Sequence, residues 1–328
     1  MKLTFKSAES SDLNPLLTFA QEFNQEDHHP FHEAIVRAGL IKLLNDGTAG
    51  RIWLIQADAE TVGYVVLTLG YRLAYGRYAF IDEIYVRPAY RSQGIGRQAI
   101  AFAEEICREL GVKALHLEVE QANAKARALY LAVGFVDYQH YLMTCWLKRP
   151  PTHSAGSGQA TDRRPPQDVF EIRNTTQAGN DSFNITFTSA QNSDIEMLAM
   201  LRQESGAEGQ ASSRATLGQV INDDSLGRIW LIETDHQPVG YVVVTFSYSL
   251  EFHGRDALLD ELYLRSSAQA ISRPSLKFAQ AQCQALGVNA LHAEMERANT
   301  LAQSLYRAVD FEDDDSYLMT KWLNDLRF

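Results

Sequence analysis

The chain carries the same pattern twice, and this duplication restricts its fold more than any other feature. Three stretches show it: RIWLI begins at Arg51 and Arg228, VGYVV at Val62 and Val239, and YLMT at Tyr141 and Tyr317. Each copy is far longer than the roughly 20 to 45 residues of a solenoid repeat, so each copy is expected to form a complete domain. The sequence predicts domains at 1–147 and 183–328. Residues 148–182, rich in Pro, Gly, Ser and Thr, are expected to form a linker.

Composition narrows the class of protein. The 328 residues are 45% hydrophobic and 22% charged, as in soluble globular proteins, and no apolar run approaches the roughly 20 residues of a membrane helix. The N-terminus has no secretory signal pattern, so we expect a cytoplasmic protein that does not bind membranes. A net charge of -11 opposes nucleic-acid binding and favours cationic partners. Cys107, Cys145 and Cys283 lack CxxC spacing and are expected to be buried thiols.

Hydrophobic periodicity predicts the elements of the first copy. Strands are expected at 51–55, 62–69, 80–86, 114–119 and 138–147, and helices at 124–133 and in a segment that Gly111 ends. Each copy is therefore predicted to be an α/β (α+β) domain. Its mixed, mostly antiparallel central sheet would be flanked by helices.

A glycine-containing loop follows one of these strands. The segment RSQGIG, from Arg91 to Gly96, lies between a strand that ends at Val86 and a long helix. Glycines let a ligand approach the backbone, and the unpaired amides of a helix's first turn attract an anion. The segment has neither the GxGxxG of a dinucleotide fold nor the GK[ST] of a nucleotide P-loop. The pattern therefore predicts a phosphate site of another type.

The larger arrangement resembles the GNAT-type N-acetyltransferases. FIDEIYV, RSQGIG, ALHLEVE and NAKARALYLAVGF follow one another between Phe80 and Phe135 in that family's order. The resemblance implies that acetyl-CoA is the co-substrate and that backbone amides hold its pyrophosphate, namely those of Gln93, Gly94, Ile95, Gly96 and Arg97. It also implies that the Arg91 and Arg97 side chains complement the phosphates. The Val86 backbone would align the pantetheine, and Asn123 would contact the pantetheine arm or cap its own helix.

The same resemblance implies the reacting groups. Tyr130 would be the general acid that protonates the departing thiolate, with a core tyrosine as the alternative. A carboxylate would help to free the attacking amine of its proton. Asp82 and Glu83 are the candidates, and strand alternation is expected to point them to opposite faces, so only one would face the acceptor. The resemblance favours Asp82, but Glu83 stays open.

The segment HHPFHE begins at His28. Adjacent histidines do not readily share one tetrahedral ion, and no further ligand spacing completes a site, so no metal is expected. The resemblance implies that this stretch borders the acceptor pocket. His28, His29 and Phe31 are therefore candidate acceptor contacts, with loop packing as the alternative.

The second copy has lost the loop. SSAQAISRPSLKF, from Ser266, contains no glycine, is two residues shorter and carries Pro274, which donates no amide. The copy nevertheless retains Asp260, Glu261 and Tyr306. We therefore expect one working site in the first domain. The second domain would serve as a built-in pseudo-dimer partner, or would bind a different ligand.

These observations lead to one functional hypothesis and two alternatives. The hypothesis is an N-acetyltransferase that moves an acetyl group directly from acetyl-CoA to a primary amine of a small cationic acceptor, such as a polyamine or an aminosugar. The reaction would take place in a ternary complex. The first alternative is a non-catalytic acyl-CoA-binding or regulatory module, which needs the glycine loop but neither Tyr130 nor Asp82. The second is a structural protein that does not bind coenzyme A.

Overall fold

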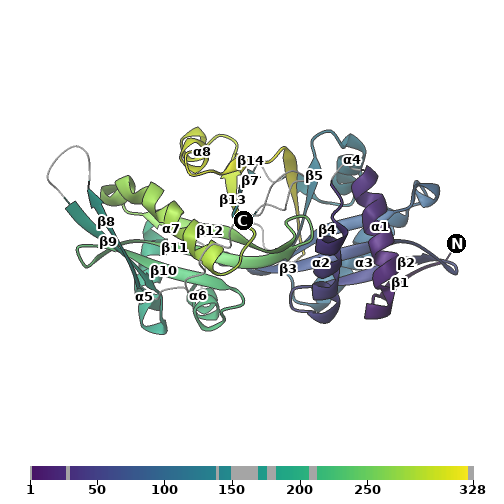
Figure 1. Cartoon of the computed structure of the whole chain (residues 1–328), viewed down its shortest axis with the longest axis horizontal. Coiled ribbons are helices and arrows are strands. Elements are labelled where there is room, and N and C mark those ends of the chain that lie inside the picture. The colour runs from purple at the N-terminus through teal and green to yellow at the C-terminus, as the bar shows by residue number, and fades with distance from the viewer. Residues whose placement is uncertain are drawn as a thin grey trace.

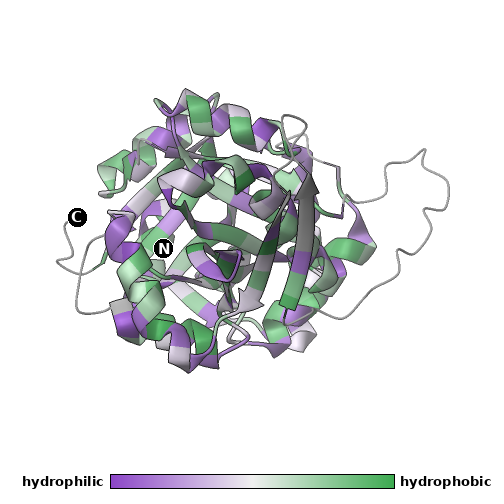
Figure 2. Cartoon of the chain, turned by 90° about the vertical axis from the view of Figure 1, so that its left-hand side faces the viewer, coloured by the Kyte–Doolittle hydropathy of each residue, from purple (hydrophilic) through white to green (hydrophobic). Residues whose placement is uncertain are grey.

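The computed structural model describes residues 2–26, 30–137, 140–148, 169–175, 182–206 and 213–323. Two mixed sheets, one toward each end of the molecule, are flanked by helices and joined through the centre (Figure 1). Apolar residues run along the strands, and the surrounding helices carry both apolar and hydrophilic residues (Figure 2). No helix in these ranges is long and apolar enough to cross a membrane.

The first half follows the predicted order closely. Its elements are β1 (Leu3–Ser7), α1 (Leu13–Glu26), α2 (Glu33–Asn45), β2 (Gly50–Ala57), β3 (Glu60–Arg72), β4 (Gly76–Val86), α3 (Ile95–Glu109), β5 (Ala114–Glu120), α4 (Ala124–Ala132), β6 (Val136–Asp137) and β7 (His140–Trp146). Helices α3 and α4 pack on one face of the sheet, and α1 and α2 pack on the other. Strand β3 is apolar along most of its length because both of its faces are covered.

The second half repeats this order and adds a strand. Its elements are β8 (Val169–Thr175), β9 (Ser182–Ser189), α5 (Ile195–Glu204), α6 (Ser213–Asn222), β10 (Gly227–Thr234), β11 (Gln237–Ser249), β12 (Gly254–Leu264), α7 (Ser272–Ala285), β13 (Ala290–Glu296), α8 (Thr300–Arg307), β14 (Glu312–Asp313) and β15 (Ser316–Trp322). Strand β8 lies inside the segment expected to be a linker and pairs with β9, so that expectation is wrong for this stretch. Its Phe170 packs 5.6 Å from Phe278 of α7, measured between ring centroids, which gives β8 an apolar anchor. Residues 149–168 and 176–181 lie outside the described ranges.

The closing strands are exchanged between the halves. Strand β15, from the end of the second half, inserts between β5 and β6 of the first sheet, with Tyr317 opposite Val119. Strand β7, from the end of the first half, lies between β13 and β14 of the second sheet, with Tyr141 opposite Met295. The yellow C-terminal strand beside the blue-green β5 is visible near the centre of Figure 1. Each sheet is thus completed by a segment from the other half.

The tips of the β3–β4 and β11–β12 hairpins are exchanged in the same way. Leu73, which is fully buried, packs among residues of α5 and α6, and Leu250 packs among residues of α1 and α2. Cys107, Cys145 and Cys283 are free and buried, as predicted. The two halves therefore share both strands and core contacts.

Candidate functional site

The glycine loop forms an open helix N-terminus. Gly94 caps α3 with φ +81°, a left-handed conformation that glycine adopts without strain. The first backbone hydrogen bond runs from the Gln98 N–H to the Gly94 carbonyl at 3.1 Å, so the amides of Ile95, Gly96 and Arg97 have no backbone partner among the described residues. No heavy atom lies within 4 Å of where a Cβ of Gly94 would be. The loop can therefore present several N–H groups to one anion.

The charged side chains of the loop differ in their surroundings. The Arg91 guanidinium donates to the Val86 carbonyl at 2.6 Å and forms an ion pair with Glu26 of α1, with a second Nη–Oε distance of 2.6 Å. The Glu26 carboxyl has a lowered pKa, chiefly because of its hydrogen bond with Arg91. Arg91 therefore ties the loop to β4 and α1. Arg97 and Gln93 are exposed beside the amides.

Strands β4 and β5 separate next to this loop. They pair in parallel only at Tyr78–Phe80 and Ala114–His116, and no pairing extends from Phe80 to Val86. The loop after β5 leads to Asn123, whose Oδ1 accepts a hydrogen bond from the Ala126 N–H at 3.0 Å. Asn123 thus caps α4, the second of the two roles considered for it.

Tyr130 lies on α4 and is 9% exposed. Its ring makes an edge contact with Phe135 at 5.9 Å between centroids, within the cluster that α3 and α4 form on the sheet. The side chain is therefore held firmly beside the strands that separate. Its counterpart Tyr306 has a pKa raised by burial to about 12.

Asp82 and Glu83 do not alternate as expected. The β3–β4 register shifts at Val66/Leu67, where Val66 faces Glu83 and Leu67 faces Ile81, so Asp82 is the extra residue of a β-bulge. A bulge turns two successive side chains toward the same face. Both carboxylates contact the cluster that α1 and α2 cover, and the expectation that they point to opposite faces is wrong.

The two carboxylates have different partners on that face. Asp82 accepts hydrogen bonds from the Ser249 hydroxyl at 2.9 Å and the Leu250 N–H at 2.8 Å, both from the second half. Burial raises the pKa of Asp82 to about 7. Glu83, 8% exposed, accepts a hydrogen bond from the Tyr64 hydroxyl. Phe31 packs partly buried at the edge of the same cluster, whereas His28 and His29 lie outside the described residues.

The equivalent region of the second half is closed. A 3₁₀-helix at Ser266–Ile271 continues directly into α7, and Ile271, at the junction, is 1% exposed. The Ser272 N–H already donates to the Gln269 carbonyl, and Pro274 has no N–H. No residue in a left-handed conformation caps the N-terminus of α7, so its first amides are not arranged like those that follow Gly94.

A cavity of about 60 Å³ lies where the two halves meet. Residues from both β4–β5 and β12–β13 line it, including Asp82, Glu118, His116, Asp256, His292 and Glu294. Arg72 and Ser249, from the two hairpin tips, also face it. The sequence pattern alone does not indicate a role for Arg72, Ser249, Glu118 or Glu294. The available signal was that ALHLEVE and ALHAEME keep a glutamate in both copies, whereas Arg72 and Ser249 differ.

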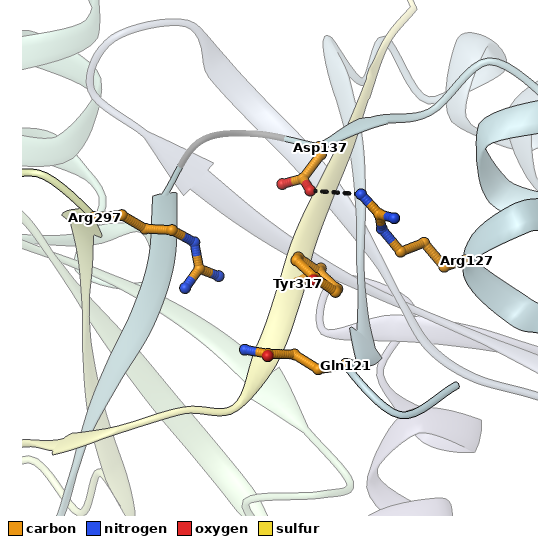
Figure 3. Close-up of a pocket in the computed structure, with 5 residues that line it drawn as sticks. All are labelled: Gln121, Arg127, Asp137, Arg297 and Tyr317. Carbon is orange, nitrogen blue, oxygen red and sulfur yellow. Dashed lines mark hydrogen bonds and ion pairs between the residues drawn. The ribbon is translucent and has the colours of Figure 1, made fainter. Parts of the chain in front are cut away.

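A larger pocket, of about 340 Å³, lies at the exchanged strand β15 (Figure 3). Tyr317 lies between two guanidinium groups, with Arg127 at 4.5 Å and Arg297 at 5.7 Å from the ring centroid. Arg127 is also paired with Asp137 at 3.1 Å. Because Arg297 belongs to the second half, this pocket too exists only through the exchange.

Comparison with known proteins agrees with these features. The model of the Acetyltransferase (GNAT) family matches residues 16–135, which contain the loop, the separating strands and Tyr130. Thialysine N-epsilon-acetyltransferase of Bos taurus is 38% identical over 76 residues, which cover 23% of this chain and 45% of that protein. Streptothricin acetyltransferase of Streptomyces lavendulae is 33% identical over 81 residues, which cover 25% and 41%. The chain spans about half the length or less of these curated relatives.

Among solved structures, the fold of the whole chain has a counterpart. A GCN5-related N-acetyltransferase from Sphaerobacter thermophilus superposes with a TM-score of 0.53 at 14% identity, covering 98% of this chain and 96% of that one. At this identity the likeness concerns the fold alone. The structure defines an α/β protein in which a glycine-containing loop leads into an open helix N-terminus. The first half of the chain matches the GNAT acetyltransferase family over residues 16–135, and the chain is built as a tandem duplication.

Proposed function

We propose that the chain is an N-acetyltransferase that transfers an acetyl group from acetyl-CoA to a primary amine of a small cationic acceptor, with its active site in the first half. One observation carries the proposal: an open, left-handed helix N-terminus at Gly94 lies beside separated strands in the first half, whereas the second half is closed there. The matched relatives are acetyltransferases, and one is named for the ε-nitrogen of thialysine.

The residues present suit both parts of acetyl-CoA. The amides from Gln93 to Arg97 would bind the pyrophosphate, aided by exposed Arg97. The unpaired edge of β4 between Phe80 and Val86 would receive the pantetheine amides as a partial strand, because its backbone groups have no partner strand there. Gly94 and Gly96 leave the phosphates room to approach the backbone.

The reaction is a direct transfer. The neutral amine attacks the thioester carbonyl carbon, a C–N bond forms, the C–S bond breaks, and the amine loses a proton while the thiolate gains one. Tyr130 is the candidate donor to the thiolate. Asp82 and Glu83 are the candidate acceptors of the amine proton, directly or through water. The pKa of Asp82, near 7, falls in the range in which a general base works best at neutral pH.

Release of free thiol from acetyl-CoA, followed across a panel of primary amines, tests the activity. Turnover with at least one amine, and formation of the N-acetyl product by mass spectrometry, are the expected results. Coenzyme A binding without turnover by any amine would replace the enzyme with a non-catalytic binding module. Absence of any coenzyme A binding would overturn both the acetyltransferase and the non-catalytic binding module.

The location of the site has its own test. Gly96→Asp places a carboxylate at the helix N-terminus that would bind the phosphates. We expect this variant to weaken coenzyme A binding at least tenfold, because the new negative charge would repel the phosphates and occupy the position that the helix dipole makes favourable for an anion. Ala270→Asp, in the closed second-half segment, is the matched control and should leave the dissociation constant unchanged. Isothermal titration measures both. Equal losses in the two variants would contradict a single site in the first half.

A further inference from the structure

The acidic groups that face the central cavity are neutralised in only one half. In the second half, Asp260 and Glu294 share the guanidinium of Arg72, which lies 3.4 Å from Asp260 Oδ1 and forms an ion pair with Glu294. Arg72 comes from the first half's hairpin tip and is buried between them. The second half therefore has a cation of the protein's own between its two carboxylates.

The equivalent place in the first half has no such cation. Asp82 and Glu118 are the counterparts of Asp260 and Glu294, and the residue that corresponds to Arg72 is Ser249. The hydroxyl of Ser249 donates to Asp82 at 2.9 Å, and the Glu118 carboxylate accepts no hydrogen bond from the described residues. Arg72 is the only arginine or lysine among the described residues that line the cavity. Two carboxylates thus face a place that a guanidinium fills in the other half.

Two further atoms of the cavity wall lack hydrogen-bond partners within the described structure. Asp256 is 8% exposed and its Oδ1 accepts no hydrogen bond, and His292 is 4% exposed and its Nε2 makes none, lying 3.5 Å from Asp256 Oδ2. Buried polar atoms normally have a partner, in the protein or in a bound molecule. A carboxyl oxygen can accept a hydrogen bond, so Asp256 Oδ1 could accept one from a donor group of a molecule that occupies the cavity.

The raised pKa values of the carboxyls that line the cavity also favour a bound cation. Burial raises the pKa of Glu118 well above its ordinary value, and the charges of Asp314, Glu251 and Asp82 add to that rise. The pKa of Asp82 is raised by burial and, to a smaller degree, by Asp256. A cation placed among these groups would stabilise their ionised forms. Glu251, the exposed member of the lining, provides a further carboxylate at the solvent side.

We propose that the cavity binds a charged nitrogen of the acceptor, other than the one that is acetylated, between Asp82 and Glu118, and that Arg72 is its built-in counterpart in the second half. This inference rests on the proposed function and defines its substrate class as small molecules with two cationic nitrogens. A nitrogen held by two carboxylates keeps its proton and cannot attack the thioester. Asp82 is thereby assigned to acceptor binding, and Glu83 is left as the candidate for proton removal.

The selectivity test uses acceptors of equal length. We expect kcat/KM for 1,4-diaminobutane to exceed that for 4-amino-1-butanol by about tenfold to a hundredfold, the value of a charge-assisted hydrogen bond. Ser249→Arg copies Arg72 into the first half and should abolish this preference. Ser193→Arg, which adds the same charge at an exposed position of the second half, should retain it. Equal selectivity in the wild type and Ser249→Arg would overturn the proposal.

A second variant covers the case in which Ser249→Arg does not fold. Glu118→Gln keeps the shape of the side chain, removes its charge and should lower the diamine preference while leaving coenzyme A binding intact. An unchanged preference in Glu118→Gln would also overturn the cation site.

A binding measurement that does not depend on acetyl transfer distinguishes this inference from the proposed function. 1,4-diaminobutane alone should raise the melting temperature of the wild type, and should not raise that of Ser249→Arg. If that shift occurs but no amine is acetylated, the cavity inference stands and the proposed function fails. If amines are acetylated but the diamine gives no shift and no preference, the proposed function stands and the cavity inference fails.

Discussion

At the scale of single residues, the exchanged hairpin tips determine the chemistry of the centre. Asp82 and Asp260 are equivalent bulge residues, and each accepts a hydrogen bond from the tip of the opposite half, from the N–H of Leu250 and of Leu73 respectively. Among the differences between the tips, the position occupied by Arg72 in one and by Ser249 in the other decides whether a cation reaches the acidic pair. The guanidinium of Arg72 therefore neutralises one acidic pair, and Ser249 supplies no charge to the other.

Asp82 should make stability depend on pH. Its folded pKa, about 7, is raised from 3.8 by burial, while Ser249 and the Leu250 N–H lower it and Asp256 raises it. The folded state therefore holds a proton that the unfolded state releases, so the stability that this proton contributes is complete below pH 4 and is lost as pH rises through 7. Each unit of pKa difference corresponds to at most about 1.4 kcal/mol. Relative to the wild type, Asp82→Asn should gain melting temperature steadily between pH 5 and pH 8.

Thermal melts at four pH values check this expectation, with Asp235→Asn, in an exposed turn, as the control. A constant difference between Asp82→Asn and the wild type would show that the carboxyl does not titrate in this interval. Such a result would also remove the support that a raised pKa gives to the cation site.

The bulge at Asp82 could not be predicted from the sequence. Apolar alternation predicted strand β4 and its end at Val86 correctly, and the glycine pattern predicted an open helix start that the structure has at Gly94. The extra residue at Asp82 leaves no mark in the alternation, because both Asp82 and Glu83 are polar. Whether Gln93 to Arg97 bind a phosphate stays a prediction. The role of Arg72 follows only from seeing which carboxylates its hairpin tip reaches.

At the scale of elements, the exchange of β7 and β15 could not be predicted. Both strands contain YLMT, and both predicted partner strands begin with ALH. The local sequence therefore does not determine which closing strand pairs with which sheet. Pairing is decided by the route of the chain between the halves, which local periodicity does not contain. The same reason explains why β8 was missed: seven residues within a Pro-rich segment gave too little pattern.

The exchange predicts that removing the last strand damages the opposite half. Ending the chain after Asp315 deletes β15, which pairs with β5 along its whole length and buries Leu318 and Met319. Each such side chain contributes about 1.5 to 3 kcal/mol by burial, so the first sheet should lose stability. We expect the truncated protein to lose coenzyme A binding, although the deleted residues belong to the second copy. Ending the chain after Leu323 is the control, and retained binding after the longer deletion would contradict the exchange.

At the scale of the whole molecule, the two halves are not independent bodies. Each sheet contains a strand of the other half, and Leu73 and Leu250 each complete a core cluster across the junction. The second half lacks an open cradle but supplies β15, Ser249 and the Leu250 N–H to the first. Absence of the glycine loop from the second half is compatible with retention of its core, because the contacts that it supplies to the first half depend on strand pairing and packing.

This arrangement predicts a single unfolding transition in place of two. Trp53 and Trp230 are buried in the first and second halves respectively, so variants that keep one or the other report each half separately by fluorescence. Their melting curves should coincide, since neither sheet can lose its exchanged strand without exposing the other's core. Coenzyme A at 100 times its dissociation constant should stabilise the protein by about 2.7 kcal/mol and shift both curves equally, although it would bind the first half alone. Two separated transitions, or a coenzyme A shift confined to the Trp53 signal, would mean that the exchanged strands do not couple the unfolding of the two halves. The second half would then contact the proposed active site but unfold independently of it.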